Sequence, residues 1–445
     1  MGQQMNTDVV DLFKEVYGDH NDLLPDDGHL ARCMPFSEKG KVGDSYQEAV
    51  TLTNESGFTL SSTTDAFELN PARAGTVKQA SVTPYISVLP SIVPWGIISR
   101  SAGAGAKAFF DATKYVVKNN LASHQRLLEI LRLYGRSSDL LGRVSFAPSG
   151  TVYRGATYSG DGNVTLTLKD GSTLAFSDGI NAAGKNILFA PGQFAAGIWV
   201  GWEGVKVNQV DSSGAIVASG SLVSVNAPLG YITVDFTPVA ATSTTSHRLC
   251  FDGMESSKDI VGVHSILKNS GTLFGIDTSK YSLWQGNVVD VNSKKFGMQV
   301  FQDGIADMVN RGGMEGDLKI FLNPRSWADV VTAETNLVRH DSSYTPVKFV
   351  NGGEGAEYHS QNGKATFYSH RAVKEGDAFA LCAPTWTRSG SAEASFKIPG
   401  MDQSIIFALE NSAGYAFRSF SDQYVFCHRP ADNALFQNIN DESAT

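Results

Sequence analysis

The feature that most constrains the fold is a run of alternating apolar and polar residues over residues 46–84. Apolar residues two positions apart recur along it, as Val50 and Leu52, Phe58 and Leu60, and Phe67 and Leu69. This period is typical of β-strands. The segment Asn70-Pro71-Ala72-Arg73-Ala74-Gly75 is rich in turn-forming residues and is predicted to be a hairpin tip. Because two strands alone are marginally stable in water, the hairpin needs another surface on which to lie.

Composition and charge limit the possible classes of protein. The chain has 445 residues, which suggests two or three packed units. Apolar residues make up 42% and charged residues 18%, so a folded core is expected. The net charge is −9 without a lysine or arginine run, which disfavours a DNA reader that gathers phosphate contacts. A protein that only encloses nucleic acid stays possible.

The N-terminal residues 1–45 are predicted to form an arm that lies across another surface. Residues Met1 to Arg32 hold seven acidic and two basic residues, a local net charge of −5. Only the stretch Val9–Tyr17 has helical apolar spacing. No signal peptide is visible, and the longest apolar run, Ile86–Ile98, is too short for a membrane span. With four widely spaced cysteines, these features predict a soluble protein made in a reducing cytoplasm.

A long helix is predicted from Ala104 to Tyr134, ending at Gly135. One apolar face follows it at helical spacing: Phe110, Val117, Leu121, His124, Leu128 and Leu131. The preceding stretch Pro84–Pro94 is predicted to break regular structure because it holds several prolines. A helix of this length with one apolar stripe needs a sheet or other helices against which to pack.

The chain after the helix changes character twice. Residues 146–252 read as an all-β module, a small barrel or sandwich, with a hairpin joining Thr165–Leu168 to Thr173–Phe176. From about residue 256, helices and strands mix. We expect a helix that stops at Gly312-Gly313, a strand at Leu318–Leu322, and a helix capped by Asn323 and Pro324. Strands return at Ser404–Leu409 and Tyr424–Cys427.

Motifs for catalysis or cofactor binding are missing from the sequence. It contains no phosphate-binding GxxxxGK[ST] loop, no GxSxG elbow and no HExxH helix. The acidic stretch from Asp19 to His29 has metal-ligand residue types but reads more simply as a solvated, turn-forming arm. His124 is expected in a core or interface, and Cys382 and Cys427 as buried inert thiols. We therefore predict no catalytic residue, no metal site and no cofactor.

The order of these elements resembles that of the major capsid proteins of tailed bacteriophages, which share the Hong Kong 97-type coat fold. Three passages carry the resemblance. Ala104–Gly135 is similar to the spine helix and directly follows a hairpin in the place of the E-loop. Gly316–Trp327 resembles the strand-then-NPxxW passage of phage coats, and Tyr424–Pro430, continued through Leu435 and Asn438-Ile439, resembles their endings.

This resemblance implies an α+β fold with a division into six parts. These are an N-terminal arm at 1–45, an extended E-loop hairpin and its return at 46–100, the spine helix of a peripheral domain at 101–145, a β-rich inserted or elaborated module at 146–255, an axial domain at 256–400, and C-terminal strands returning to the core at 401–445.

The function that the resemblance implies is that of a coat protein and not of an enzyme. Copies would assemble into hexameric and pentameric capsomers of an icosahedral shell around double-stranded DNA, in the virion, after assembly in the host cytoplasm. A separate scaffolding protein, a portal and a decoration protein are the other expected partners, with no membrane and no sequence-specific DNA contact. Two alternatives stay open: a β-rich hydrolytic, carbohydrate-active enzyme, and an encapsulin-like compartment shell.

Charged residues suggest where copies touch. The hairpin carries Pro71 with Arg73 and Lys78, and the arm carries carboxylates at Asp22, Asp26 and Asp27. We predict that the two basic side chains near the hairpin tip of one copy meet these acidic positions on the arm of another.

Overall fold

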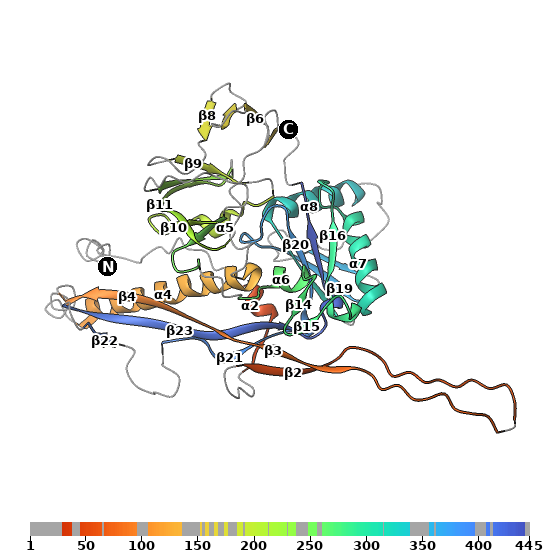
Figure 1. Ribbon diagram of the computed structural model, residues 1–445. Helices are drawn as coiled ribbons and strands as arrows, with labels where there is room; N and C mark the ends of the chain where they lie inside the picture. The colour runs from red at the N-terminus through yellow and green to blue at the C-terminus, as the bar shows by residue number, and fades with distance from the viewer. Residues whose placement is uncertain are drawn as a thin grey trace. The chain divides into compact units, whose positions relative to one another are not determined.

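The computed structural model describes residues 29–37, 45–95, 106–135, 152–236, 248–255, 260–338, 356–396 and 406–440, with short gaps inside several of these ranges. The chain divides into two compact units, each built from segments far apart in the sequence. The first unit comprises Met1–Tyr46, Thr83–Ile130 and Arg388–Phe426, and the second comprises Gln47–Val82, Leu131–Thr387 and Cys427–Thr445. Helices and strands occur in both units (Figure 1), as the α+β prediction requires.

A long helix and a narrow sheet make up the first unit. The elements are α2 (His29–Cys33), β1 (Phe36–Ser37), β4 (Tyr85–Pro94), α4 (Ala106–Tyr134), β21 (Trp386–Ser395), β22 (Ile406–Ala408) and β23 (Gly414–Cys427), the last residues of α4 and β23 and the first of β21 belonging to the second unit. The sheet has the order β1-β21-β23-β22, and β4 also pairs with β23. The predicted long helix is confirmed, within two residues at its start.

The predicted break at Pro84–Pro94 is wrong, because β4 is a ten-residue strand there. It pairs antiparallel with β23 from Tyr85 opposite Gln423 to Pro94 opposite Gly414. The Trp95 N–H donates to the Ala413 carbonyl (3.0 Å), so alternate residues starting from Trp95 face β23, and Pro90 and Pro94 face the other way. A proline on the outer side of an edge strand sacrifices no ladder hydrogen bond and blunts that edge.

Polar groups fasten α4 to the sheet. His124 is fully buried and its ring nitrogens lie 2.8 Å from Ser419 Oγ and 2.9 Å from Ser87 Oγ. One turn earlier, Asn120 Nδ2 donates to Ser91 Oγ (2.8 Å). These bonds fix the helix along both β4 and β23, and His124 has the structural place that the sequence predicted.

The second unit is organised around a six-stranded mixed sheet. Its strands, in spatial order, are β16 (Asn287–Asp290), β24 (Ala434–Gln437), β20 (Ala378–Cys382), β17 (Leu318–Leu322), β19 (Lys364–Ser369) and β18 (Ala356–His359). Helices α7 (Met298–Gly312) and α8 (Pro324–Val338) contribute buried side chains to the core of this sheet.

Local sequence signals in this region are confirmed. Gly313 ends α7 in the left-handed region with φ of 89°. The strand at Leu318–Leu322 has the predicted bounds. The Arg325 N–H donates to Asn323 Oδ1 (3.0 Å) at the start of α8, which is the capping role expected for Asn323.

The β-rich module also belongs to the second unit. One antiparallel sheet has the order β5-β6-β7-β8, formed by Val152–Tyr153, Ala156–Ser159, Val164–Thr167 and Thr173–Phe176, and confirms the predicted hairpin. The other has the order β13-β10-β11-β12-β9, formed by Arg248–Phe251, Lys206–Val210, Ile216–Asn226, Tyr231–Phe236 and Lys185–Leu188. The rings of Phe189 and Phe251 pack on Trp199, with centroids 5.6 and 5.4 Å away.

Short elements complete the second unit. They are the hairpin strands β2 (Tyr46–Thr51, whose first residue lies in the first unit) and β3 (Val77–Val82), α5 (Ala196–Trp199), α6 (Val263–Leu267), β14 (Thr272–Leu273), β15 (Ile276–Asp277), and the 3-10 turns η1 (Ser282–Trp284), η2 (Ala383–Thr385) and η3 (Pro430–Asp432). The four cysteines, all in described ranges, form no disulfide. Within the described ranges, no helix has the length and apolarity to cross a bilayer.

Gly135 gives a prediction about how α4 ends. Its φ is +70°, and a Cβ there would collide with the Ile260 carbonyl oxygen. Gly275 has a similar φ of +82° but open space around its Cβ position. Gly275→Ala should therefore show only the backbone cost, about 1–2 kcal/mol, whereas Gly135→Ala should lower the thermal midpoint by clearly more. Equal midpoints of the two variants in calorimetry would show that the close approach at Gly135 does not matter.

Candidate functional site

The hairpin between β2 and β3 carries several exposed apolar side chains on its outer part. Strands β2 and β3 form a two-stranded sheet at its base, and the pairing continues outward through two bonds between Ser56 and Arg73 (2.9 and 2.8 Å). Further out, the Asn70 N–H donates to Thr59 Oγ1 (2.7 Å). This register places the turn near Thr64.

The predicted tip at Asn70–Gly75 is therefore wrong, since these residues lie on the second side of the hairpin, where the chain returns toward β3. The turn uses the polar run Ser61-Ser62-Thr63-Thr64, where Ser61 Oγ accepts the Thr63 N–H (3.2 Å). Serine and threonine can close a turn through such side-chain bonds. The turn therefore forms at these residues and not at Pro71 and Gly75, which the sequence favoured. Pro71 and Arg73 are exposed along the arm, and Lys78 lies in β3.

One face of the outer hairpin is apolar and exposed. The register puts Leu60 opposite Leu69, and alternation adds Phe58 and Phe67 to the same face. The exposed fractions are 82% for Phe58, 96% for Leu60, 50% for Phe67 and 76% for Leu69. We call these four side chains the hairpin face. Figure 1 shows the ribbon that carries them running away from β2 and β3.

The base of the hairpin is anchored to its own unit. The Ser81 N–H donates to the Phe274 carbonyl (2.9 Å), and Lys78 Nζ lies 5.3 Å from the centre of the Tyr281 ring. His428 Nδ1 lies 3.6 Å from Glu48 Oε2, with both side chains partly exposed. The hairpin therefore projects from a fixed root, and Lys78 already has a partner at that root.

A small cavity lies beside this root. Its volume is about 90 Å³. It is lined by Val50, Thr51 and Leu52 of the hairpin, by Leu283, Trp284 and Gly312, and by His428, Arg429, Ala431 and Asp432. We call it the base cavity. Most of its wall is apolar, and its polar groups include His428 and the ion pair between Arg429 and Asp432.

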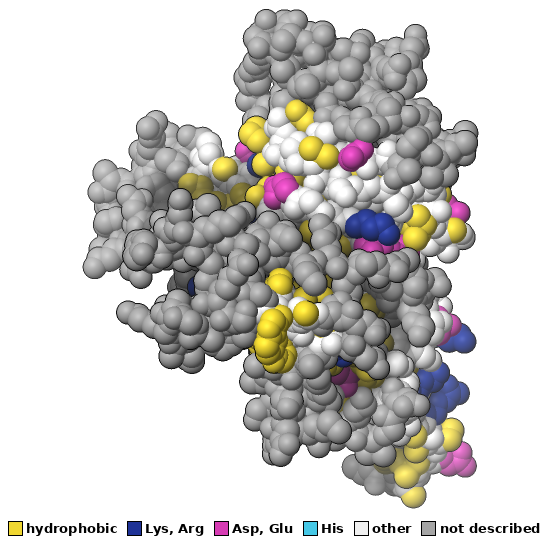
Figure 2. All heavy atoms as spheres, turned by 90° about the vertical axis from the view of Figure 1, so that its left-hand side faces the viewer, with side chains coloured by type: hydrophobic (Ala, Val, Ile, Leu, Met, Phe, Trp, Pro, Cys, Tyr) yellow, Lys and Arg dark blue, Asp and Glu magenta, His cyan; other side chains and the backbone are white. Residues whose placement is uncertain are grey.

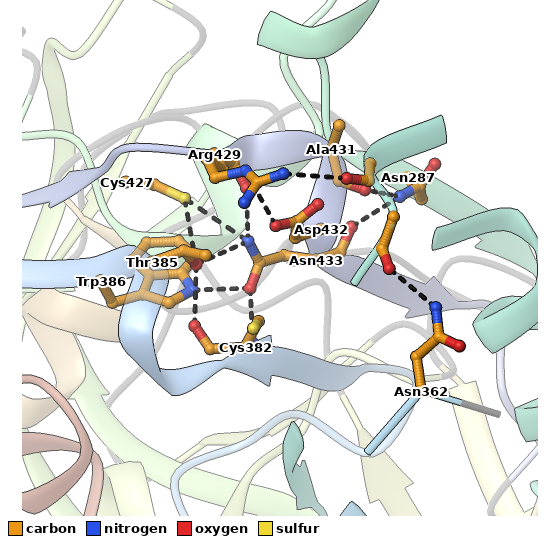
Figure 3. Close-up of polar contacts among 12 residues, drawn as sticks. Asn287, Asn362, Cys382, Thr385, Trp386, Cys427, Arg429, Ala431, Asp432 and Asn433 are labelled. Atoms are coloured by element: carbon orange, nitrogen blue, oxygen red, sulfur yellow. Dashed lines mark hydrogen bonds and ion pairs between the residues drawn. The ribbon is translucent and has the colours of Figure 1, made fainter. Parts of the chain in front are cut away.

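A buried amide organises the chain beneath the cavity (Figure 3). Asn433 Oδ1 accepts the Cys382 N–H and the Trp386 Nε1–H, both at 2.7 Å. Its Nδ2 donates to Thr385 Oγ1 (3.1 Å) and to the Arg429 carbonyl (2.9 Å). One side chain thereby ties the end of β20, the start of β21 and the turn η3 together.

Neighbouring groups complete this network. Arg429 Nε lies 3.2 Å from Asp432 Oδ2, and Arg429 also donates to the Gly312 carbonyl (3.1 Å). Burial strongly raises the pKa of the Cys427 thiol above its ordinary value, so the reactive thiolate is disfavoured there. This agrees with the expected role of Cys427 as an inert core residue.

The other predicted site residues fall in two groups. Asp22, Asp26 and Asp27 lie outside the described residues, as does most of the metal-like stretch Asp19–His29, so their pairing with the hairpin stays a prediction. Elsewhere in the described ranges, no group of three histidine, cysteine or acidic residues could hold a metal ion.

Sequence reasoning missed the base cavity and Asn433. The cavity joins β2, η1, α7 and η3, which are far apart in the chain, and no local pattern marks a buried asparagine as a hub. Two residues of the C-terminal passage that carried the resemblance, His428 and Arg429, line this cavity.

Comparison with known proteins gives structural likenesses only. No family model and no curated protein matches this chain. The capsid of a native GTA particle is similar, with a TM-score of 0.48 and 8% identity over 95% of this chain and 94% of that one. The capsid of cyanophage A-1(L) has a TM-score of 0.48 and 10% identity over 96% of both chains.

A third similar structure is the holo-SrpI encapsulin complex from Synechococcus elongatus, with a TM-score of 0.42 and 7% identity over 100% of this chain and 98% of that one. These are the kinds of protein that the sequence resemblance named.

The Asn433 network predicts a large effect of a small change. Asn433→Ala leaves the Cys382 N–H and the Trp386 indole N–H buried without their acceptor, which should cost about 3 kcal/mol or more. Asn362→Ala is the matched control, because the exposed Asn362 makes one bond, to the Gly313 carbonyl (2.9 Å). Thermal unfolding should show a much lower midpoint for Asn433→Ala only. Similar midpoints for both would mean that Asn433 is not a hub.

Proposed function

We propose that this chain is the major capsid protein of a tailed bacteriophage, forming hexameric and pentameric capsomers of an icosahedral shell around double-stranded DNA. The observation that carries the proposal is the hairpin face, which is held extended on a fixed root and left exposed by its own unit. Such a face finds its burial on a sister chain.

The energy involved suits assembly from many weak contacts. Burying one large apolar side chain contributes about 1.5–3 kcal/mol, so the four side chains of the hairpin face offer on the order of 6–12 kcal/mol. Association costs about 4–15 kcal/mol in lost motion, so one hairpin contact is weak by itself. A closed shell adds several such contacts per subunit by symmetry and effective concentration. The subunit therefore stays soluble until many copies meet.

The charge pattern supports a shell that encloses DNA without binding it strongly. On the face drawn in Figure 2, the acidic and basic side chains of the described residues are scattered, without a continuous basic patch. With a net charge of −9, the chain gives little reason for strong phosphate binding. A separate scaffolding protein, a portal and a decoration protein complete the proposal, with assembly in the host cytoplasm.

We assign the parts of the chain accordingly. Residues 1–45 are the arm, 46–100 the E-loop hairpin and its return, and 101–145 the spine-helix region of a peripheral domain. Residues 146–255 are an added β-rich module, 256–400 the axial domain, and 401–445 the returning strands. No catalytic role is assigned.

Removing two of the four side chains of the hairpin face should weaken assembly while leaving the subunit folded. We expect Phe58→Ser with Leu60→Ser to raise the concentration needed for assembly at least tenfold, because about two side chains' worth of burial is lost. Negative-stain microscopy and sedimentation measure the particles, and thermal unfolding checks the subunit. Ile216→Ser with Val223→Ser is the control, since both residues are half-exposed on β11.

The outcomes separate the classes of protein. Capsomers or closed particles with nuclease-protected DNA support the coat protein. Particles filled with protein cargo would favour an encapsulin-like shell, and a small monodisperse oligomer at all concentrations would contradict both.

Reversing the charges at Arg73 and Lys78 tests the proposed contact between the hairpin and the N-terminal arm of another copy. We propose that Arg73 meets Asp22, Asp26 or Asp27 of another copy, with Lys78 contributing from the root, where it already faces Tyr281. Arg73→Glu with Lys78→Glu should impair assembly without reducing subunit solubility. Arg73→Glu alone should account for most of the effect. Normal particles from the double variant would remove this contact from the proposal.

A further inference from the structure

We propose that the β-rich module stabilises the six-stranded sheet of its own chain, by holding the loop that joins β19 to β20. This loop comprises residues 370–377. The part of the module that contacts it comprises residues 192–197, between β9 and α5 and into α5. Both segments belong to the second unit. We call the contact between them the module contact.

Backbone hydrogen bonds form the module contact. They run from the Glu375 N–H to the Phe194 carbonyl (2.9 Å), from the Gly376 N–H to the Gly192 carbonyl (2.9 Å), and from the Gly197 N–H to the Arg371 carbonyl (3.0 Å). Glu375 and Gly376 are buried. Because a buried N–H that loses its acceptor is costly, the loop depends on the module for this conformation.

Glycines let the two backbones touch directly at the module contact. A Cβ added to Gly192 would lie 2.9 Å from the Gly376 Cα, and Gly192 has a φ of +75°. A Cβ added to Gly197 would lie 2.6 Å from the Arg371 carbonyl oxygen. Only glycine allows so close an approach, so the contact is part of the backbone architecture of the module and the loop.

A buried lysine extends the module contact to the end of α4. Lys374 is only 1% exposed, and its Nζ donates to Gln193 Oε1 (3.0 Å) and lies 4.7 Å from the centre of the Tyr134 ring. The Lys374 N–H donates to the Tyr134 hydroxyl oxygen (2.8 Å), and that hydroxyl donates to Asp377 Oδ2 (3.1 Å). A buried ammonium is tolerated only where such partners replace its water.

A second link joins the module to α8. Arg325, in the first turn of α8, donates through Nη2 to the Pro228 carbonyl (2.9 Å) in the turn after β11. Its Nε lies 3.5 Å from Glu375 Oε1. Beside it, Asn323 Nδ2 donates to the Val373 carbonyl (2.8 Å). The module, the start of α8 and the loop therefore hold one another in place.

Hydrogen exchange of the full-length, unassembled chain at rising denaturant concentration tests this role. Peptides from β10 to β12 report on the module, and peptides from β17 and β20 report on the six-stranded sheet. We expect both sets to lose protection at the same denaturant concentration, because elements that depend on one another open together. A module that loses protection at a clearly lower concentration than the sheet would be an independent attachment, and the inference would be wrong.

Two glycines of the module give a matched pair of variants. Gly192 and Gly204 both have positive φ, +75° and +85°, but a Cβ at Gly204 meets nothing within 4 Å. Both alanine variants therefore carry the backbone cost, and only Gly192→Ala also pushes the loop away. We expect the β20 amides to exchange about tenfold faster or more in Gly192→Ala than in Gly204→Ala. Equal exchange at β20 in the two variants would overturn the inference.

The reciprocal change is made in the loop and measured in the module. Lys374→Met should shift the loss of protection of β10 to β12 and of β20 to lower denaturant together. Lys206→Met is the control, because Lys206 Nζ lies 3.0 Å from Asp252 Oδ1 in a half-exposed pair, which contributes little. A shift at β20 without one in the module would contradict the inference, and if Lys374→Met does not fold, the glycine pair decides. All these results are read on the subunit, so they leave the coat function standing.

Discussion

The structure depends on an apolar face that its own unit does not cover. Phe58, Leu60, Phe67 and Leu69 stand on a hairpin held extended by backbone pairing. In water, such a face is unfavourable in proportion to its exposed apolar area. The chain tolerates this cost because the ribbon is narrow and offers only a few large side chains. In the proposed assembly, the same face becomes the driving force for association.

A projecting hairpin has a defined direction only if the residues at its root are held in place. Here the root lies against η1 and η3, and Asn433 ties η3 to the end of β20 and the start of β21 through a fully used amide. Such a saturated buried group favours one arrangement of the chain, because every alternative leaves donors unpaired. The fold therefore combines an exposed hairpin with a highly constrained buried region next to its root.

Strand β4 also limits unwanted pairing with strands of other molecules. Strand β4 is ten residues long and carries Pro90 and Pro94 on the side away from β23. An edge of this length without prolines would invite other strands to pair with it. The proposed association is thereby left to the side chains of the hairpin face, which are more selective than a backbone edge.

The sequence by itself determined the elements with strong local signals. The long helix ending at Gly135, the strand at Leu318–Leu322, the Asn323 cap and the existence of the hairpin all follow from periodicity and from glycine, proline and asparagine chemistry. Only the tertiary structure decided the hairpin turn near Thr64, the strand character of Tyr85–Pro94, the Asn433 hub and the base cavity. These depend on register and on contacts between distant segments. A local pattern cannot show that the missing N–H of a proline faces an open edge, or that four separate segments meet around one cavity.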